Sequence, residues 1–171
     1  MPTKSRALTL DDIAAVIALS NEQPDRQRIY KAVEAIAAET CGWVLLTTLR
    51  HDVARQAVVR LHSSDEKAYP VGGTKPLDKL TENHTIMERG DVALAATSAD
   101  IKRMFFDHEL ISSLGITAIL NAPIRHGGRR LGTLNFCGTE GMYGKAEIQT
   151  AKILAGLLTP CLLLEVPRDQ A

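Results

Sequence analysis

Apolar residues recur every three or four positions near both ends of the chain, a spacing typical of amphipathic helices. Near the N-terminus, Thr9 followed by Asp12 matches a variant of the capping box. Asp25 is placed to cap a second helix and Gly42 to end it. Near the C-terminus, Pro160 is expected to kink the last helix or to end its regular part. The predicted helices cover residues 9–20, 26–40 and 144–164.

From Trp43 onward the pattern changes, and runs rich in β-forming residues alternate with turn signals. The clearest signal is the Gly127-Gly128 pair between two such runs, which predicts a tight β-hairpin. A similar pattern earlier in the chain predicts another hairpin. The predicted strands cover 43–49, 55–63, 92–96, 116–125 and 131–138, and short helical segments are predicted over 82–89, 100–106 and 108–114.

Strand hairpins with helices at both ends favour an α+β fold built on an antiparallel sheet. We expect the terminal helices to cover one face of the sheet, and the loops and short helices over 65–115 to cover the other. The predicted organisation is an N-terminal helical extension over 1–24, one domain over 25–166 and a short tail over 167–171.

Composition excludes several classes of protein. The chain has 171 residues, of which 45% are hydrophobic, and its 20 basic residues balance its 20 acidic residues. A nucleic-acid-binding or polybasic membrane-surface protein normally shows a basic excess, so we expect neither kind of partner. No apolar stretch approaches the roughly 20 residues of a spanning helix, and the N-terminus lacks a signal-peptide core. Three widely spaced cysteines do not suggest disulfides, which favours a cytoplasmic location.

The chain resembles a GAF domain over about residues 26–164. The resemblance rests on GWVLLTTLR, AVVRLHSS, and FFDHELISSLGITAILNAPIRHGGRRLGTLNFCG, followed by the helix after Tyr143. It implies a central antiparallel sheet of five or six strands, a small-molecule pocket on one face, and terminal helices that often form a dimer interface. The family includes cyclic-nucleotide sensors, bilin and haem proteins, metabolite sensors and a free-methionine-sulfoxide reductase, and the fold alone does not choose among them.

The residues do not support the redox chemistry of the reductases or a covalently bound cofactor. The reductases use a close pair of cysteines in the segment that covers the pocket, whereas Cys41, Cys137 and Cys161 all lie outside residues 65–115. We therefore do not expect that activity. No covalent chromophore site and no metal-binding motif is apparent, and the cofactor stays unassigned. Haem would need an axial histidine, for which three residues are candidates by type alone: His62, His84 and His108.

Strand alternation points to a polar pocket. On the second predicted strand, Arg60 and His62 fall on one face. If Arg125 pairs with Arg130, then Thr133, Asn135 and Cys137 also share a face, and Asn121 lies on the opposite one, where it would hydrogen-bond a helix terminus. Polar groups on a covered sheet face need partners, so these side chains favour a ligand pocket in which arginine grips a carboxylate or phosphate. The alternative is an edge strand with Arg60 and His62 in solvent.

Two loop segments complete the candidate site. The loop around Tyr69 and Lys75 offers a ring with a hydroxyl, a mobile charge, and glycines that permit close backbone approach. The segment over 105–109 clusters aromatic, acidic and histidine side chains that are able to move protons, unless it is only a solvated helix start. The predicted ligand-binding residues are Arg60, His62, Tyr69, Lys75, Phe106, His108, Glu109, Thr133 and Asn135.

We interpret the sequence as a small-molecule-binding sensory domain whose ligand is a small anionic metabolite. No output domain lies within these residues, so it would act through a homodimer or on a separate partner. One alternative is a small-metabolite enzyme with acid–base groups among Tyr69, Lys75, His62, His108 and Glu109. The other is an interaction module whose pocket is filled by side chains. The predicted apolar dimer seam consists of Ile13, Val16, Ile17, Leu154, Leu157 and Leu158.

Overall fold

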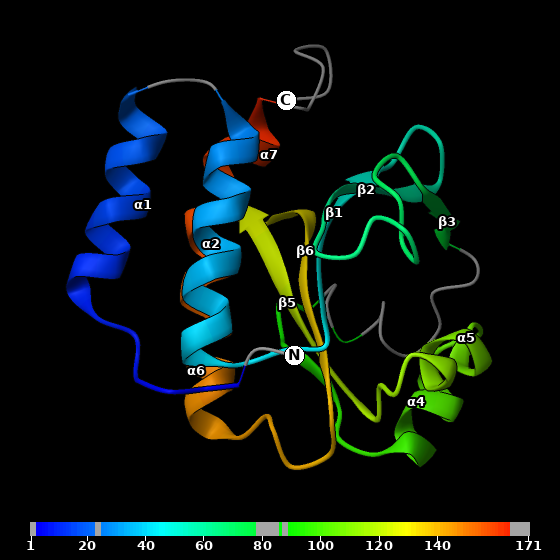
Figure 1. Ribbon diagram of the computed structural model, residues 1–171. Helices are drawn as coiled ribbons and strands as arrows, with labels where there is room; N and C mark the ends of the chain where they lie inside the picture. Colours follow the sequence, from blue (N-terminus) through cyan, green and yellow to red (C-terminus); the bar gives the residue numbers. More distant parts are fainter. Residues whose placement is uncertain (1–2, 23–24, 78–85, 87–88, 165–171) are drawn as a thin grey trace.

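A six-stranded antiparallel sheet forms the centre of the computed structural model, which describes residues 3–22, 25–77, 86 and 89–164 (Figure 1). The strands lie in the order β3-β2-β1-β6-β5-β4, with every neighbouring pair antiparallel. Their bounds are β1 Leu45–Asp52, β2 Ala57–Ser63, β3 Thr74–Pro76, β4 Ala93–Ala95, β5 Ala118–His126 and β6 Arg129–Gly138. The predicted α+β class and antiparallel sheet are confirmed.

Helices cover the two faces of the sheet unequally (Figure 1). Four helices gather on one side: α1 Leu10–Glu22, α2 Arg26–Thr40, α6 Lys145–Leu157 and α7 Thr159–Leu163. The short helices α4 Ser98–Met104 and α5 His108–Ser113 lie on the other. Pro160 stands in the first turn of α7 and divides the predicted last helix in two, because proline lacks the N–H of a helix interior. None of the described helices is long and apolar enough to cross a membrane.

Side chains alternate between two apolar clusters, one on each face of the sheet. The larger cluster, under α2 and α6, contains Leu46, Leu134 and Phe136. The smaller cluster, beside α4 and α5, contains the intervening residues Leu45 and Cys137. Because successive side chains of a strand point to opposite faces, both faces are covered. The sheet is thus buried on both sides, as the sequence predicts.

The helix starts follow the capping pattern, with one shift. Thr9 and Asp12 exchange the two capping-box hydrogen bonds at α1, and the Asp25 carboxylate accepts from the Gln27 amide at α2. At α4 the capping residue is Thr97, so this helix begins two residues before the predicted segment over 100–106. The strands differ more from the prediction: β1, β2 and β5 begin two residues later, β6 begins two residues earlier, and β3 was not predicted at all. The predicted helix over 82–89 and the tail over 167–171 fall largely or wholly outside the described residues.

Two β-bulges change which side chains share a face. Leu61 is an extra residue in β2, since Arg60 pairs with Leu49 while His62 pairs with Thr48, the residue just before it in β1. Leu131 is an extra residue in β6, where Ile124 pairs with Gly132 although Arg125 pairs with Arg130 as predicted. A bulge adds one residue to one strand only and so reverses the alternation beyond it. The predicted faces of His62 and Asn121 are therefore wrong.

The predicted dimer seam is largely internal to the chain. Val16, Leu154 and Leu158 are fully buried in the larger apolar cluster. Ile13 and Leu157 are half-buried, and Ile17 is exposed. Because α1 packs against its own neighbouring helices, the apolar stripes of the terminal helices fill the core of one chain first.

We expect the Asp12→Asn variant to be less stable than the wild type at pH 7, with a difference that shrinks as the pH falls from about 4 toward 2. The Arg6 guanidinium donates to both carboxylate oxygens of Asp12, at 2.6 and 2.8 Å, and this contact lowers the pKa of Asp12. A carboxyl whose pKa is lower in the folded state stabilises the fold above its ordinary pKa of about 4, and the contribution is lost as the pH falls. Urea unfolding at several pH values measures the difference, with Asp11→Asn in the same helical turn as control. A difference from the wild type that persists unchanged at pH 2 would contradict the ion-pair explanation.

Candidate functional site

A cavity of about 80 Å³ lies on the face of the sheet beside α4 and α5. Its walls come from β1, β2, β3, β5 and β6, from the loop at Tyr69 and from the segment over 104–111. A single water needs only roughly 10–15 Å³ of such space, so the cavity holds several waters or a small organic molecule. Most of the accessible lining surface is apolar, and polar side chains are set among it, which is the usual character of a ligand pocket.

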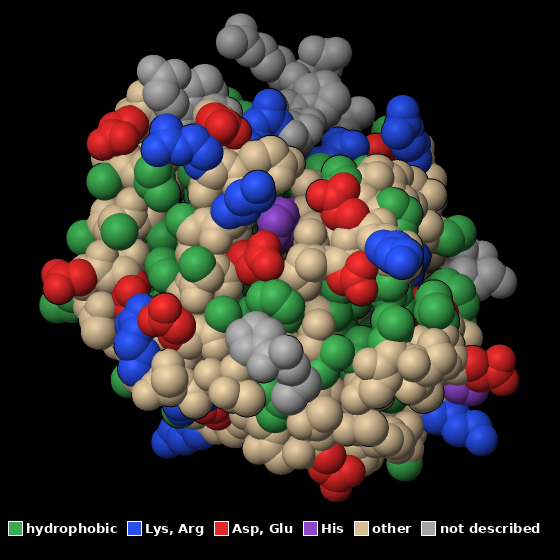
Figure 2. All heavy atoms as spheres, viewed as in Figure 1, with side chains coloured by type: hydrophobic (Ala, Val, Ile, Leu, Met, Phe, Trp, Pro, Cys, Tyr) green, Lys and Arg blue, Asp and Glu red, His purple; other side chains and the backbone are tan. Residues whose placement is uncertain are grey.

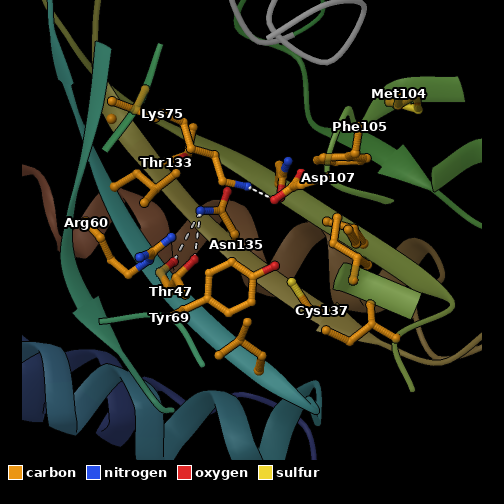
Figure 3. Close-up of a pocket in the computed structure, with 18 of the residues that line it drawn as sticks. Thr47, Arg60, Tyr69, Lys75, Met104, Phe105, Asp107, Thr133, Asn135 and Cys137 are labelled. Atoms are coloured by element: carbon orange, nitrogen blue, oxygen red, sulfur yellow. Dashed lines mark hydrogen bonds and ion pairs between the residues drawn. The ribbon is translucent and has the colours of Figure 1, made fainter. Parts of the chain in front are cut away.

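Arg60 is a buried cation at one wall of this cavity (Figure 3). Its side chain is 6% exposed, its Nη1 donates to the Pro70 carbonyl at 2.9 Å, and its guanidinium lies 4.8 Å from the ring centre of Tyr69. The loop wraps it closely, because a Cβ on Gly73 would lie 2.6 Å from Nη1. Burial lowers the pKa of Arg60. No carboxylate of the described residues forms an ion pair with it.

Lys75 and Asp107 form an ion pair beside the cavity (Figure 3). Lys75 Nζ lies 2.5 Å from Asp107 Oδ2, and it also lies 5.7 Å from the ring centre of Tyr69 and 5.6 Å from that of Phe106. The pair joins β3 to the segment between α4 and α5. The other carboxylate oxygen, Oδ1, is buried without a hydrogen-bond partner.

Two asparagines face each other across β5 and β6 in the cavity wall. Asn135 Nδ2 donates to the hydroxyl of Thr47 at 3.1 Å, across to β1. Asn121 pairs directly with Asn135 in the strand register, and its Oδ1 is buried with no partner. At this pair of strand positions, the side-chain amide of Asn135 is therefore hydrogen-bonded within the protein, whereas the carbonyl oxygen of Asn121 is available to a ligand.

Six of the nine predicted ligand-binding residues line the cavity. They are Arg60, Tyr69, Lys75, Phe106, Thr133 and Asn135. His108 and Glu109 begin α5 and do not line it. His62 is turned to the opposite face by the bulge at Leu61, where its Nε2 lies 2.8 Å from Glu34 Oε2 and its ring stacks on Tyr30.

Five polar lining residues were not in the predicted set: Thr47, His51, Asp107, Asn121 and Arg130. Asp107 belonged to the segment already singled out as a proton-transfer candidate. Asn121 was singled out as a polar residue in mid-strand, but the unpredicted bulge at Leu131 misplaced its face. The same bulge turns Arg130 into the cavity wall, and no feature of the sequence signals it.

The lining has limited catalytic chemistry. Cys137 lies in the wall, and burial raises the pKa of its thiol to about 12, so it is protonated near neutral pH. Of the predicted acid–base groups, only Tyr69 and Lys75 line the cavity, and burial raises the pKa of Tyr69. Among the described residues no three metal-ligating side chains come together. For haem, His62 and His108 do not reach the cavity, and His84 lies outside the described residues.

A family model for the GAF domain matches residues 12–161 of the chain. The chain belongs to the GAF domain family. The match begins within α1 and ends within α7, so all six strands of this GAF domain fall inside it. The chain matches none of the curated proteins with which it was compared.

Solved structures share the fold of this GAF domain at low sequence identity. The GAF domain of a phosphoenolpyruvate-protein phosphotransferase from Coxiella burnetii has 17% identity and a TM-score of 0.69, over 91% of this chain and 95% of that one. The GAF domain of a two-component sensor histidine kinase from Bacillus halodurans has 14% identity and a TM-score of 0.65, over 93% and 97%. The free methionine-R-sulfoxide reductase of Neisseria meningitidis has 12% identity and a TM-score of 0.69, over 95% and 96%. These likenesses establish the fold.

Proposed function

We propose that this GAF domain is a regulatory module that binds a small anionic metabolite in the cavity between the sheet and α4–α5. One observation carries the proposal: Arg60 is 6% exposed, lines the cavity, and has no carboxylate partner among the described residues. The carboxylate of Asp107 acts on Arg60 electrostatically but forms its ion pair with Lys75. A buried cation without a carboxylate in direct contact is costly, and an anionic ligand would supply that contact. The sensor histidine kinase and phosphotransferase domains that share the fold support a regulatory role, and the three free cysteines favour the cytoplasm.

The test is the thermal unfolding of the purified protein with a panel of small organic acids and inorganic phosphate, beside native mass spectrometry of protein never denatured. An anion present at about 100 times its Kd is expected to stabilise the fold by about 2.7 kcal/mol. Arg60→Met should abolish this gain, while Arg28→Met, at an exposed arginine, should retain it. Equal gains in the two variants would reject Arg60 as the anion-binding group.

The two alternative functions fare differently. An enzyme would need acid–base groups that converge, and two of the five predicted ones line the cavity. An interaction module would have a filled pocket, whereas this one is open. We therefore place the regulatory function first.

We also propose that the domain signals as a homodimer or to a separate partner through the surface of α1. Leu10 and Ile17 on α1 are 82% and 47% exposed, and Ile153 on the neighbouring α6 is 42% exposed. Figure 2 shows hydrophobic side chains at the surface over α1, between acidic and basic ones. Clustered exposed apolar groups are typical of interaction sites.

The dimer part is checked by sedimentation of the wild type and the Leu10→Asp/Ile17→Asp double variant. We expect the wild type to sediment as a dimer and the variant as a folded monomer, because buried unpaired carboxylates oppose association. Leu110→Asp, at an exposed leucine of α5, serves as the control and should stay dimeric. A monomeric wild type at high micromolar concentration would leave only the separate-partner mode.

A further inference from the structure

Several buried polar atoms in the cavity lining lack hydrogen-bond partners. Three of them, Arg60 Nε, Asp107 Oδ1 and Asn121 Oδ1, are contributed by β2, the α4–α5 connection and β5. Buried polar groups are almost always hydrogen-bonded, so each such atom calls for an explanation. Because all three line one cavity, a single ligand in that cavity accounts for them together.

The three atoms specify what the ligand must carry. Arg60 Nε is a donor, whereas Asp107 Oδ1 and Asn121 Oδ1 are acceptors. Since Arg60 Nη1 is held by the Pro70 carbonyl, the free edge of the guanidinium is the one formed by Nε and Nη2. That edge presents two parallel N–H groups and fits a carboxylate. The ligand therefore needs a carboxylate for Arg60 and a hydrogen-bond donor for the two oxygens.

The charges that line the cavity favour a hydroxyl over an ammonium group as the hydrogen-bond donor of the ligand. Among the lining residues that the structure describes, three are cationic, Arg60, Lys75 and Arg130, and one is a carboxylate, Asp107. Lys75 Nζ already forms an ion pair with Oδ2 of that carboxylate. A ligand ammonium group would add another cation beside Lys75 and be repelled at this short range. A hydroxyl donates a hydrogen bond without adding charge, so it meets the acceptors at no electrostatic cost.

We propose that the ligand is a small hydroxycarboxylic acid. Its carboxylate is bound by the Nε–Nη2 edge of Arg60, and its hydroxyl donates to Asp107 Oδ1 or Asn121 Oδ1. Its carbon chain lies against the apolar part of the lining, which includes Leu45, Val58 and Ile119. This inference rests on the proposed function and narrows it from anions in general to acids that carry a hydroxyl group.

The test is a matched series of three- to five-carbon acids, measured by calorimetry with the wild-type protein at pH 7. Each chain length is presented as the 2-hydroxy acid, the unsubstituted acid and the 2-amino acid. At one chain length or more, the hydroxy acid is expected to bind at least about tenfold more tightly than either analogue. If the unsubstituted acid binds equally well, or the amino acid binds more tightly, the hydroxyl inference is wrong and anion binding stands. If no acid binds, the proposed function fails and this inference with it.

Substitutions at Asp107 and Asn121 test which oxygen accepts the hydrogen bond from the ligand hydroxyl. Asp107→Asn and Asn121→Leu should each lower the ratio of hydroxy-acid to unsubstituted-acid affinity, one of them to about one. Glu66→Gln, at an exposed carboxylate, is the control and should keep the wild-type ratio. An unchanged ratio in both site variants, each checked for folding by circular dichroism, would overturn the assignment of these two oxygens. Because the ratio compares two ligands on one protein, a loss of stability in a variant does not by itself alter it.

Discussion

Replacing Phe136 by alanine is expected to destabilise the GAF domain by about 3–5 kcal/mol, the usual cost of removing a fully buried aromatic side chain. Phe136 has no exposed surface and stands on β6, at the centre of the sheet. Leu46 of β1 and Leu120 of β5 flank it directly in the register, and the ring of Tyr143 meets it edge-on at 6.3 Å. A cavity there is enclosed on all sides, so the surroundings have little freedom to collapse into it.

Urea unfolding followed by fluorescence or circular dichroism measures this loss. A domain of ordinary stability has about 5–15 kcal/mol in total, so Phe136→Ala removes a large share and Phe136→Leu serves as the milder variant. Phe106→Ala, at a ring that is 52% exposed beside the cavity, should cost less than about 1 kcal/mol. A cost below about 1 kcal/mol at Phe136 would mean that the larger apolar cluster is not packed as the structure has it.

The fold could be predicted from the sequence because its signals are local. The Gly127-Gly128 turn, with φ of 55° and 78°, fixes the β5–β6 hairpin, since both residues take the left-handed backbone that glycine tolerates. Asp25 and Pro160 mark the boundaries of α2 and α7 in the same local way. Such signals depend on only a few neighbouring residues, so they can be recognised in the sequence without knowing the tertiary contacts.

The candidate site could be predicted only in part, because face assignments depend on register. One extra residue at Leu61 and one at Leu131 reversed the predicted faces of His62 and Asn121. Both bulge residues are leucines, which also occupy regular strand positions, so alternation alone does not reveal the bulge. The Lys75–Asp107 pair joins residues 32 positions apart through tertiary packing, which no local pattern encodes.

The two facing asparagines of the cavity wall are expected to respond in opposite directions to the same substitution. Asn121→Leu should stabilise the ligand-free protein by about 1–2 kcal/mol, because it removes a buried acceptor that has no partner. Asn135→Leu should destabilise it by about 1–2 kcal/mol, because it breaks the hydrogen bond to Thr47 and leaves that buried hydroxyl without its donor. The two variants match in volume change, strand position and burial, so each is the control for the other.

Denaturant unfolding of the two variants beside the wild type gives both signs in one experiment. A group that lowers stability while it has no role within the protein is typical of a binding site, where affinity is gained at the expense of stability. If both variants lose stability, Asn121 Oδ1 has a partner within the protein and is not held open for a ligand. If Asn121→Leu is more stable than the wild type but is stabilised less by small acids, then Asn121 Oδ1 lowers the stability of the ligand-free protein and also contributes to ligand binding.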